Sequence, residues 1–423
     1  MRRIVDLLLR DRVLLLICAF GLLARVTFVA TLEPRLYWPI DEGAYDHLAK
    51  ALASGKGYVT PEGEFTAYRP VGYPAFLALL YSVFGPNLVV VRLVQSLLTT
   101  ALVCVVYLLG RHLFTKEVAR VAAGMCALYP YYIYISGVLY SEALSVLLMA
   151  CGVYLFIAAC ERPATAKFVI VGALLGALVL TRPNTVAAFP FFLAWYIWVP
   201  GVRRRVPVWM PGVAMAVAVL LILPWMARNQ VRLGAFTLAT NGGRNFWLGN
   251  NPGATADTGN EVPLTPELTA KLEGARSEVE RDRVYYASGL QFIRRQPSRF
   301  LGLTASKAIA FWRLYPVPSS GFKQHEGFSK LASIVTYGPI LVLAIVGLAV
   351  SWANAPERNL AFLCLFVCFN VAHAVYISIV RLRLPLDLFL MTFAAYAVTR
   401  AREWCAQLTC GKREKSVGRV EER

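Results

Sequence analysis

The sequence predicts an all-α polytopic membrane protein with about ten transmembrane helices and with interfacial helices in two outer loops. Three observations support this class: 57% of the 423 residues are hydrophobic, only 16% are charged, and the mean hydropathy is +0.54. Soluble domains carry about 25% charged residues, and a bilayer core needs roughly 20 apolar residues per helix. The stretches that we assign to spans are 13–32, 87–114, 118–136, 143–160, 168–180, 186–199, 209–226, 331–352, 360–380 and 384–398.

The formal net charge of +18 follows membrane topology rather than a nucleic-acid surface. Lysines and arginines concentrate in the short segments between spans, and basic loops of this kind stay in the cytoplasm. A cytoplasmic, arginine-rich N-terminus puts the basic loops near 111–120, 162–167 and 203–205 on the same side. An even number of spans then keeps both termini there, including the basic tail 401–423. We expect membrane lipids as partners and no nucleic acid.

Apart from the basic tail 401–423, we expect a single transmembrane module, residues 1–400. It contains two longer polar segments, 33–86 and 227–330, which we expect on the outer side. In the first segment, apolar residues recur at helical spacing from Tyr45 to Leu52, which predicts a short amphipathic helix on the membrane surface. Residues 76–84 are apolar but too few to cross a bilayer, so we expect a second interfacial helix there.

The second polar segment begins with a Gly/Asn-rich run, 241–253, that predicts a shaped loop. A charged helix follows, with Thr265 as its N-cap and the Gln296–Pro297 pair as its end. The apolar stretch 299–314 contains Lys307 and Arg313, which favours an interfacial or re-entrant helix over an eleventh span. Within the tail, residues after Gly411 are expected to be disordered.

Neither a disulfide framework nor a metal centre is expected. All nine cysteines fall in predicted spans or in the tail, and Cys364 and Cys368, one helical turn apart, have no further ligands nearby and indicate packing. No phosphate-binding Gly-rich loop and no cytoplasmic Asp-x-Asp element is present. We therefore expect no required cofactor, although a divalent metal is possible.

Asp41 and Glu42 are adjacent acids just outside the first predicted span, where a carboxylate meets both a membrane-held substrate and water. That position suits a general base, which contributes about 10²–10⁴-fold in rate when it lies within hydrogen-bond reach of the reacting proton. The alternative for Asp41 is a helix cap, a role that would lower its pKa.

Four arginines lie inside or beside apolar spans, where each charge costs on the order of 2.5–3.5 kcal/mol on insertion scales. Near the outer ends of their spans they could converge on one anionic group, such as a departing lipid phosphate, which gains charge without needing a proton. The alternative is snorkelling, or pairing with Glu142 at another outer helix end. Lys307 is a similar candidate. The four arginines are Arg25, Arg182, Arg381 and Arg383.

Several short motifs, in their order along the chain, resemble those of the lipid-dependent membrane glycosyltransferases of the GT-C superfamily. They are the Arg25-containing first span, the Asp41–Glu42 pair, and the segments 69–74, 140–142, 180–184 and 381–385. The resemblance is strongest to the branch with the protein O-mannosyltransferases and the lipid A aminoarabinose transferases. An Arg-Leu-Arg sequence at 381–383 stands where Arg-Tyr is frequent in that branch.

The resemblance implies a helical bundle whose first outer loop bears the catalytic acid, here Asp41, with Glu42 in support. It implies an inverting transfer from a polyprenyl-phosphate-linked sugar to a glycan, lipid or protein hydroxyl on the outer face of a bacterial inner (plasma) membrane. Tyr68, Arg69 and Glu142 are then expected to orient substrate.

Two other functions fit the same residues. A lipid-carrier flippase also uses polytopic bundles with intramembrane arginines, although such transporters often contain repeated halves, which this sequence lacks. An oligosaccharide ligase differs from the predicted glycosyltransferase only in its donor, a glycan linked to the lipid through a pyrophosphate.

Overall fold

The computed structural model describes residues 2–36, 41–256, 262–315 and 326–421. Helices and connecting turns make up this part of the chain, with an isolated β-bridge between Val59 and Phe65. The helices are α1 (Arg2–Leu9), α2 (Arg12–Ala30), α3 (Asp41–Ala53), α4 (Gly72–Phe84), α5 (Leu88–Leu113), α6 (Lys116–Leu128), α7 (Pro130–Gly137), α8 (Glu142–Glu161), α9 (Thr165–Thr181), η1 (Pro183–Ala188), α10 (Phe189–Trp198), α11 (Val202–Arg205), α12 (Trp209–Leu233), α13 (Gly242–Gly249), α14 (Pro266–Glu273), α15 (Glu278–Arg295), α16 (Pro297–Ala310), α17 (Glu326–Trp352), α18 (Pro356–Val375), η3 (Val380–Arg383) and α19 (Leu384–Glu421).

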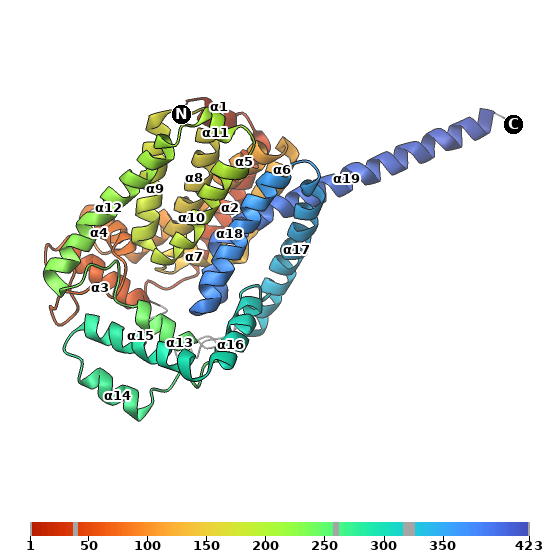
Figure 1. The fold of residues 1–423 in the computed structure, drawn as a ribbon. Coiled ribbons are helices and arrows are strands. Elements are labelled where there is room, and N and C mark those ends of the chain that lie inside the picture. Colours follow the sequence, from red (N-terminus) through yellow and green to blue (C-terminus); the bar gives the residue numbers. More distant parts are fainter. Residues whose placement is uncertain (1, 37–40, 257–261, 316–325, 422–423) are drawn as a thin grey trace.

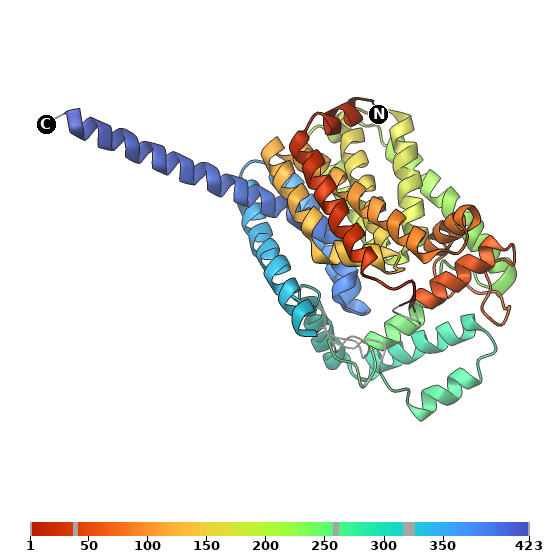
Figure 2. The same cartoon turned by 180° about the vertical axis from the view of Figure 1, so that it is seen from behind.

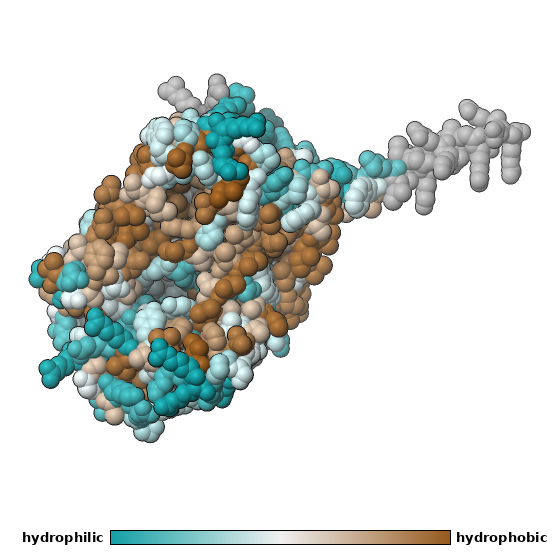
Figure 3. Space-filling model, in the orientation of Figure 1, coloured by the Kyte–Doolittle hydropathy of each residue, from teal (hydrophilic) through white to brown (hydrophobic). Residues whose placement is uncertain are grey.

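The predicted all-α polytopic membrane fold is confirmed, with a smaller number of full-length spans. Within the described residues, seven helices are long and apolar enough to cross a membrane: α2, α5, α8, α12, α17, α18 and α19. Figure 3 shows brown, apolar side chains over the middle of the molecule and teal, polar ones toward its two ends. The bundle therefore has the hydropathy pattern of a protein embedded in lipid.

The other three expected spans are helical but shorter or broken. Segment 118–136 divides into α6 and α7 because Pro130 forces Tyr129 into an extended conformation. Segment 168–180 is α9, of 17 residues. Segment 186–199 is η1 followed by α10, which has 10 residues. All three lie among the longer helices in Figure 1.

Small residues allow α9 and α12 to pack closely. A Cβ atom on Gly172 of α9 would lie 2.2 Å from the carbonyl oxygen of Ala214 on α12, and one on Gly176 would lie 3.0 Å from that of Ala218. The two glycines are one turn apart and face two alanines one turn apart, so the backbones meet without side chains between them.

The described parts of the two polar segments, 33–86 and 227–330, form a layer at the end of the bundle away from α1 and α11 (Figures 1 and 2). α3 and α4 confirm the two short helices expected in residues 33–86. The single charged helix expected after Thr265 is wrong: Thr265 does cap α14, but the chain bends near Gly274 and α15 starts at Glu278. α12 also continues to Leu233, past the expected boundary at 227.

The stretch 299–314 contains α16, which has 14 residues and is not among the candidate spans. The expected disorder after Gly411 is wrong, because α19 is one helix of 38 residues that leaves the bundle as a straight arm (Figure 1). Ala, Arg, Glu, Lys and Gln in this tail all favour helix, which accounts for the difference.

Candidate active site

Asp41 is the first residue of α3, and its carboxylate lies between two guanidinium groups. Oδ1 accepts a hydrogen bond from Arg69 Nη2 at 2.6 Å, and Oδ2 accepts one from Arg381 Nη1 at 2.9 Å. Arg69 comes from the turn before α4, and Arg381 comes from η3 near the other end of the chain. Three segments that are remote in sequence therefore meet at one carboxylate.

Glu142, the first residue of α8, extends this contact. Its Oε1 lies 2.7 Å from Arg182 Nη1 and 3.7 Å from Arg381 Nε. Arg182 caps the C-terminus of α9. We call the connected row Arg69–Asp41–Arg381–Glu142–Arg182 the Asp41 network. It contains three guanidinium groups and two carboxylates, so the ion-paired set has one positive charge in excess.

Aromatic rings support the arginines of this network. The Arg69 guanidinium lies 5.3 Å from the ring centre of Tyr45 and 5.6 Å from that of Tyr68, and the Arg381 guanidinium lies 5.1 Å from that of Tyr140. Cation–π contacts at these distances hold a guanidinium without consuming its N–H donors.

The environment of Asp41 has opposing effects on its pKa. Burial raises the pKa of this carboxyl, but the positive charges of Arg381 and Arg69 outweigh burial and hold the pKa below its ordinary value. Asp41 is therefore ionised throughout the neutral range. The predicted alternative was a helix cap, but among the described residues the hydrogen bonds of the Asp41 carboxylate come from the two arginines.

A glycine brings the Arg69 turn to Arg182. A Cβ on Gly72 would lie 2.6 Å from Thr181 Oγ1 and 2.8 Å from the carbonyl carbon of Leu180. Only glycine allows the start of α4 to pack this closely on the end of α9. This contact sets Arg69 and Arg182 on the same side of the bundle.

Glu42 has a different position from Asp41. Its side chain is fully buried, and Oε1 accepts a hydrogen bond from the backbone N–H of Leu139 at 2.7 Å. Glu42 thus joins α3 to the connection between α7 and α8, at a residue three positions before Glu142.

Three of the basic residues proposed from the sequence lie outside the Asp41 network. Arg25 is buried on α2 and donates to the carbonyls of Gly21 and Ala127 and to Thr99 Oγ1. Lys307 is buried on α16 and donates to backbone carbonyls of α13 and α18. The third, Arg383, lines a separate pocket.

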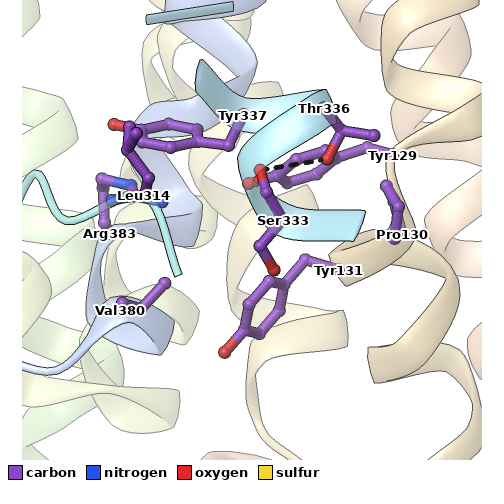
Figure 4. Close-up of a pocket in the computed structure, with 9 residues that line it drawn as sticks. All are labelled: Tyr129, Pro130, Tyr131, Leu314, Ser333, Thr336, Tyr337, Val380 and Arg383. Atoms are coloured by element: carbon purple, nitrogen blue, oxygen red, sulfur yellow. Dashed lines mark hydrogen bonds between the residues drawn. The ribbon is translucent and has the colours of Figure 1, made fainter. Parts of the chain in front are cut away.

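Arg383 points away from Arg381 on the same short helix. Its Nε lies 2.9 Å from Asp387, and its guanidinium lies 3.5 Å from the ring centre of Tyr337. Arg383 and Tyr337 also line a small pocket beside α7 and α17, which Figure 4 shows with three tyrosines around it. The lining residues are Tyr129, Pro130, Tyr131, Leu314, Ser333, Thr336, Tyr337, Val380 and Arg383.

Two residues that the sequence did not single out hold the Arg69 turn. Glu278 at the start of α15 accepts hydrogen bonds from Thr66 Oγ1 at 2.6 Å and from the N–H of Ala67 at 2.7 Å. Arg228 near the end of α12 donates to the carbonyls of Thr66 and Tyr58. Arg228 is detectable as a charge at the end of an apolar stretch, but Glu278 is one of several acids in a polar segment and gives no distinct signal.

Among the described residues, no group of three or more His, Cys, Asp or Glu side chains is placed to hold a metal ion. Whether the protein requires a metal stays a prediction from the sequence.

Part of the sequence matches a glycosyltransferase family model, and the fold is similar to that of solved membrane proteins. Residues 68–227 match the family model described as dolichyl-phosphate-mannose-protein mannosyltransferase. The fold is also similar to that of an oligosaccharyltransferase from Archaeoglobus fulgidus, AglB, solved with an inhibitory peptide and a dolichol-phosphate, at 16% identity and a TM-score of 0.57. That likeness covers 95% of this chain and 51% of AglB. The resemblance to the GT-C superfamily is thereby confirmed.

Two further structures are similar. The A. fulgidus enzyme tethered to an acceptor peptide has 15% identity and a TM-score of 0.55 over 93% of this chain and 50% of that one. ArnT from Cupriavidus metallidurans, bound to undecaprenyl phosphate, has 14% identity and a TM-score of 0.46 over 91% of this chain and 77% of that one. The chain spans about half the length of the oligosaccharyltransferase. No curated protein matches it.

Proposed function

We propose that this protein is an inverting glycosyltransferase that moves a sugar from a polyprenyl-phosphate donor to a hydroxyl acceptor on the extracytoplasmic face of a bacterial inner membrane. The observation that carries the proposal is the Asp41 carboxylate, ionised and held between Arg69 and Arg381 at the outer end of an apolar bundle. A carboxylate and an excess of guanidinium groups are the two elements that this chemistry needs.

The donor phosphate is proposed to bind the arginines of the Asp41 network. Arg69 Nε and Arg381 Nε are buried and have no hydrogen-bond partner among the described residues, so both can donate to phosphate oxygens. The excess positive charge of the network favours an anion there, because charge-assisted hydrogen bonds to phosphate are about twice as strong as neutral ones.

Asp41 is proposed as the base. Each of its oxygens accepts one hydrogen bond from an arginine, and a carboxylate oxygen can accept two, which leaves room for the acceptor hydroxyl. The acceptor oxygen attacks the anomeric carbon from the face opposite the phosphate. The bond from that carbon to the phosphate oxygen breaks with its electron pair, and the acceptor proton passes to Asp41.

The leaving lipid phosphate gains the negative charge, which the arginines stabilise as it develops. Glu142 orients Arg182 and Arg381, and Tyr68 supports Arg69. Glu42 keeps α3 in place through Leu139. The basic helix α11 lies at the opposite end of the bundle (Figure 1), in accord with cytoplasmic termini and an outer active site.

The test is transfer by purified protein in lipid nanodiscs, supplied with polyprenyl-phosphate sugars and membrane extract as acceptor. Asp41→Asn keeps the shape of the side chain but cannot take a proton, and we expect turnover to fall by about 10²–10⁴-fold. A matched control is Asp282→Asn, on α15, whose carboxylate accepts from the N–H of Gly243 outside the Asp41 network. Turnover of D41N within a few-fold of wild type would refute the assignment of the base.

The likeness in fold to an oligosaccharyltransferase makes a pyrophosphate-linked oligosaccharide the second candidate donor. The same assay distinguishes it, because transfer would then require the pyrophosphate donor and fail with every monophosphate. Tight binding of the lipid carrier without any transfer would instead favour a flippase.

A further inference from the structure

Lys307 carries a buried positive charge that no carboxylate of the described residues pairs with. Its side chain is 1% exposed, and no carboxylate of the described residues lies within ion-pair distance of its ammonium group. Burial lowers the pKa of Lys307 to about 8, so the group is charged at neutral pH at a cost in stability. A side chain that served packing alone would be apolar, because a buried unpaired charge is expensive.

The partners of this ammonium group are the C-terminal ends of two helices. Nζ lies 3.0 Å from the carbonyl oxygen of Gly249, the last residue of α13, and 2.9 Å from that of Tyr376, the C-cap of α18. Val375 O and Asn250 Oδ1 lie at 3.5 Å. Because the carbonyl ends of helices carry partial negative charge, one ammonium group joins both.

The contact leaves no room for adjustment. A Cβ on Gly249 would lie 1.7 Å from the carbonyl oxygen of Tyr376, so the two backbones are in direct contact. Asn250 Nδ2 adds a hydrogen bond of 2.8 Å to Val375 O, and Asn370 of α18 donates to Ala308 of α16 at 3.0 Å. Three outer-layer elements, α13, α16 and the end of α18, are fixed to one another here.

The chain leaves this junction toward the Asp41 network. Tyr376 is followed by Ile377, Ser378 and Ile379, and then by η3, which carries Arg381. No regular helix separates the junction from Arg381, so the position of the Tyr376 backbone determines where η3 begins.

We propose that Lys307 is a positioning residue: it fixes the end of α18 against α13 and thereby sets Arg381 between Asp41 and Glu142. The donors of its ammonium group are directed to protein carbonyls, so it acts through Arg381 and not by touching substrate. The inference rests on the proposed function, in which Arg381 holds the donor phosphate.

The test is a double-mutant cycle between Lys307 and Arg381 in nanodiscs. Lys307→Met keeps the length of the side chain and removes the charge. A displacement of about 1 Å at a reacting group costs on the order of 10²-fold, so we expect K307M to lower turnover by about 10- to 100-fold. In the Arg381→Gln background, the same substitution should change turnover by less than about twofold, because the arginine that it misplaces is already gone.

Two variants complete the design. Lys271→Met removes an exposed lysine of α14 in the same outer segment and is expected to leave turnover unchanged. Gly249→Ala keeps the charge of Lys307 but displaces the same backbone contact, since its Cβ would lie 1.7 Å from Tyr376 O and 3.1 Å from Lys307 Nζ. It should reproduce the K307M result, including its dependence on Arg381. G249A also tests the proposal if K307M does not purify as a folded protein.

Multiplicative effects of K307M and R381Q would overturn the proposal, since they would show that Lys307 acts independently of Arg381. So would wild-type turnover in K307M. The same cycle is run on the affinity for polyprenyl phosphate, measured by displacement of a fluorescent lipid phosphate. If wild type transfers no sugar, the proposed function fails, and the binding cycle still decides whether the two residues are coupled.

Discussion

Replacing Arg381 by lysine tests the Asp41 network at its centre. Arg381 contacts Asp41 through Nη1 at 2.9 Å and approaches Glu142 through Nε at 3.7 Å, whereas a lysine has a single point of charge and can serve only one carboxylate. We therefore expect R381K to keep the charge of the site but lose one charge-assisted contact.

The magnitude follows from that one contact. The contact with Glu142, at 3.7 Å, is an ion pair rather than a hydrogen bond, and the Arg381 side chain is 31% exposed, so its contribution is about 1 kcal/mol. Because about 1.36 kcal/mol in the barrier is tenfold in rate, we expect a loss of about fivefold. The effect should appear in kcat, because the contact counts most when the leaving phosphate gains charge.

The assay is single-turnover transfer of a radiolabelled sugar in nanodiscs, with Arg383→Lys as the matched control two residues away. Arg383 is 1% exposed and paired with the fully buried Asp387, so R383K is expected to lower the melting temperature more than the turnover per folded molecule. The reasoning fails if R381K transfers sugar at the wild-type rate, or if both variants show the same combination of stability and turnover.

Further predictions concern pH, packing and metal. Removing one guanidinium group with Arg69→Met should raise the pKa of Asp41 by on the order of 1–3 units; since the base must be ionised, the acid limb of the pH–rate profile should move to higher pH, and an unmoved limb would mean that another group titrates. Gly172→Ala should destabilise the protein by about 1–3 kcal/mol because its Cβ would meet the Ala214 carbonyl at 2.2 Å, whereas Gly212→Ala, with open space around it, should stabilise it by about 0.5–1 kcal/mol in a thermal-shift comparison; equal shifts would contradict the close approach of α9 and α12. Treatment with a chelator should leave turnover unchanged, and loss that is restored by a divalent cation would show that a metal is required.

The all-α membrane class was predictable from the sequence because it depends on the share and the run length of apolar residues. Neither property depends on how the helices pack. The number of full-length spans was less predictable, since a window of apolar residues such as 118–136 hides the break that Pro130 causes. The arm of α19 was missed for a related reason: a polar composition resembles disorder, although its residues individually favour helix.

The arginines of the Asp41 network could be proposed from the sequence as site residues, but they could not be distinguished from arginines with other partners. Arg25 and Arg381 look alike as charges beside apolar residues, yet the guanidinium of Arg25 donates to carbonyls of α2 and α6 and to Thr99. Tertiary contacts decide which group an arginine binds. For Arg69 and Arg182 these include the packing of Gly72 on Thr181, and for Arg381 they include the position of η3. The hydrogen bonds of Glu278 to Thr66 and Ala67 could not be predicted for the same reason, because these partners lie more than 200 residues away in the sequence.

The sequence separations within the Asp41 network bear on biosynthesis. Asp41 and Arg381 are 340 residues apart, and the ribosome adds about 5–20 residues per second. The early helices thus wait on the order of half a minute in the membrane before Arg381 is made. During that interval Asp41 can pair with Arg69 and Glu142 with Arg182, but a chain stalled before η3 lacks Arg381, which joins the two pairs. In the proposed transferase, catalytic competence is therefore tied to the last stage of membrane insertion, which would keep unfinished chains from consuming the lipid carrier.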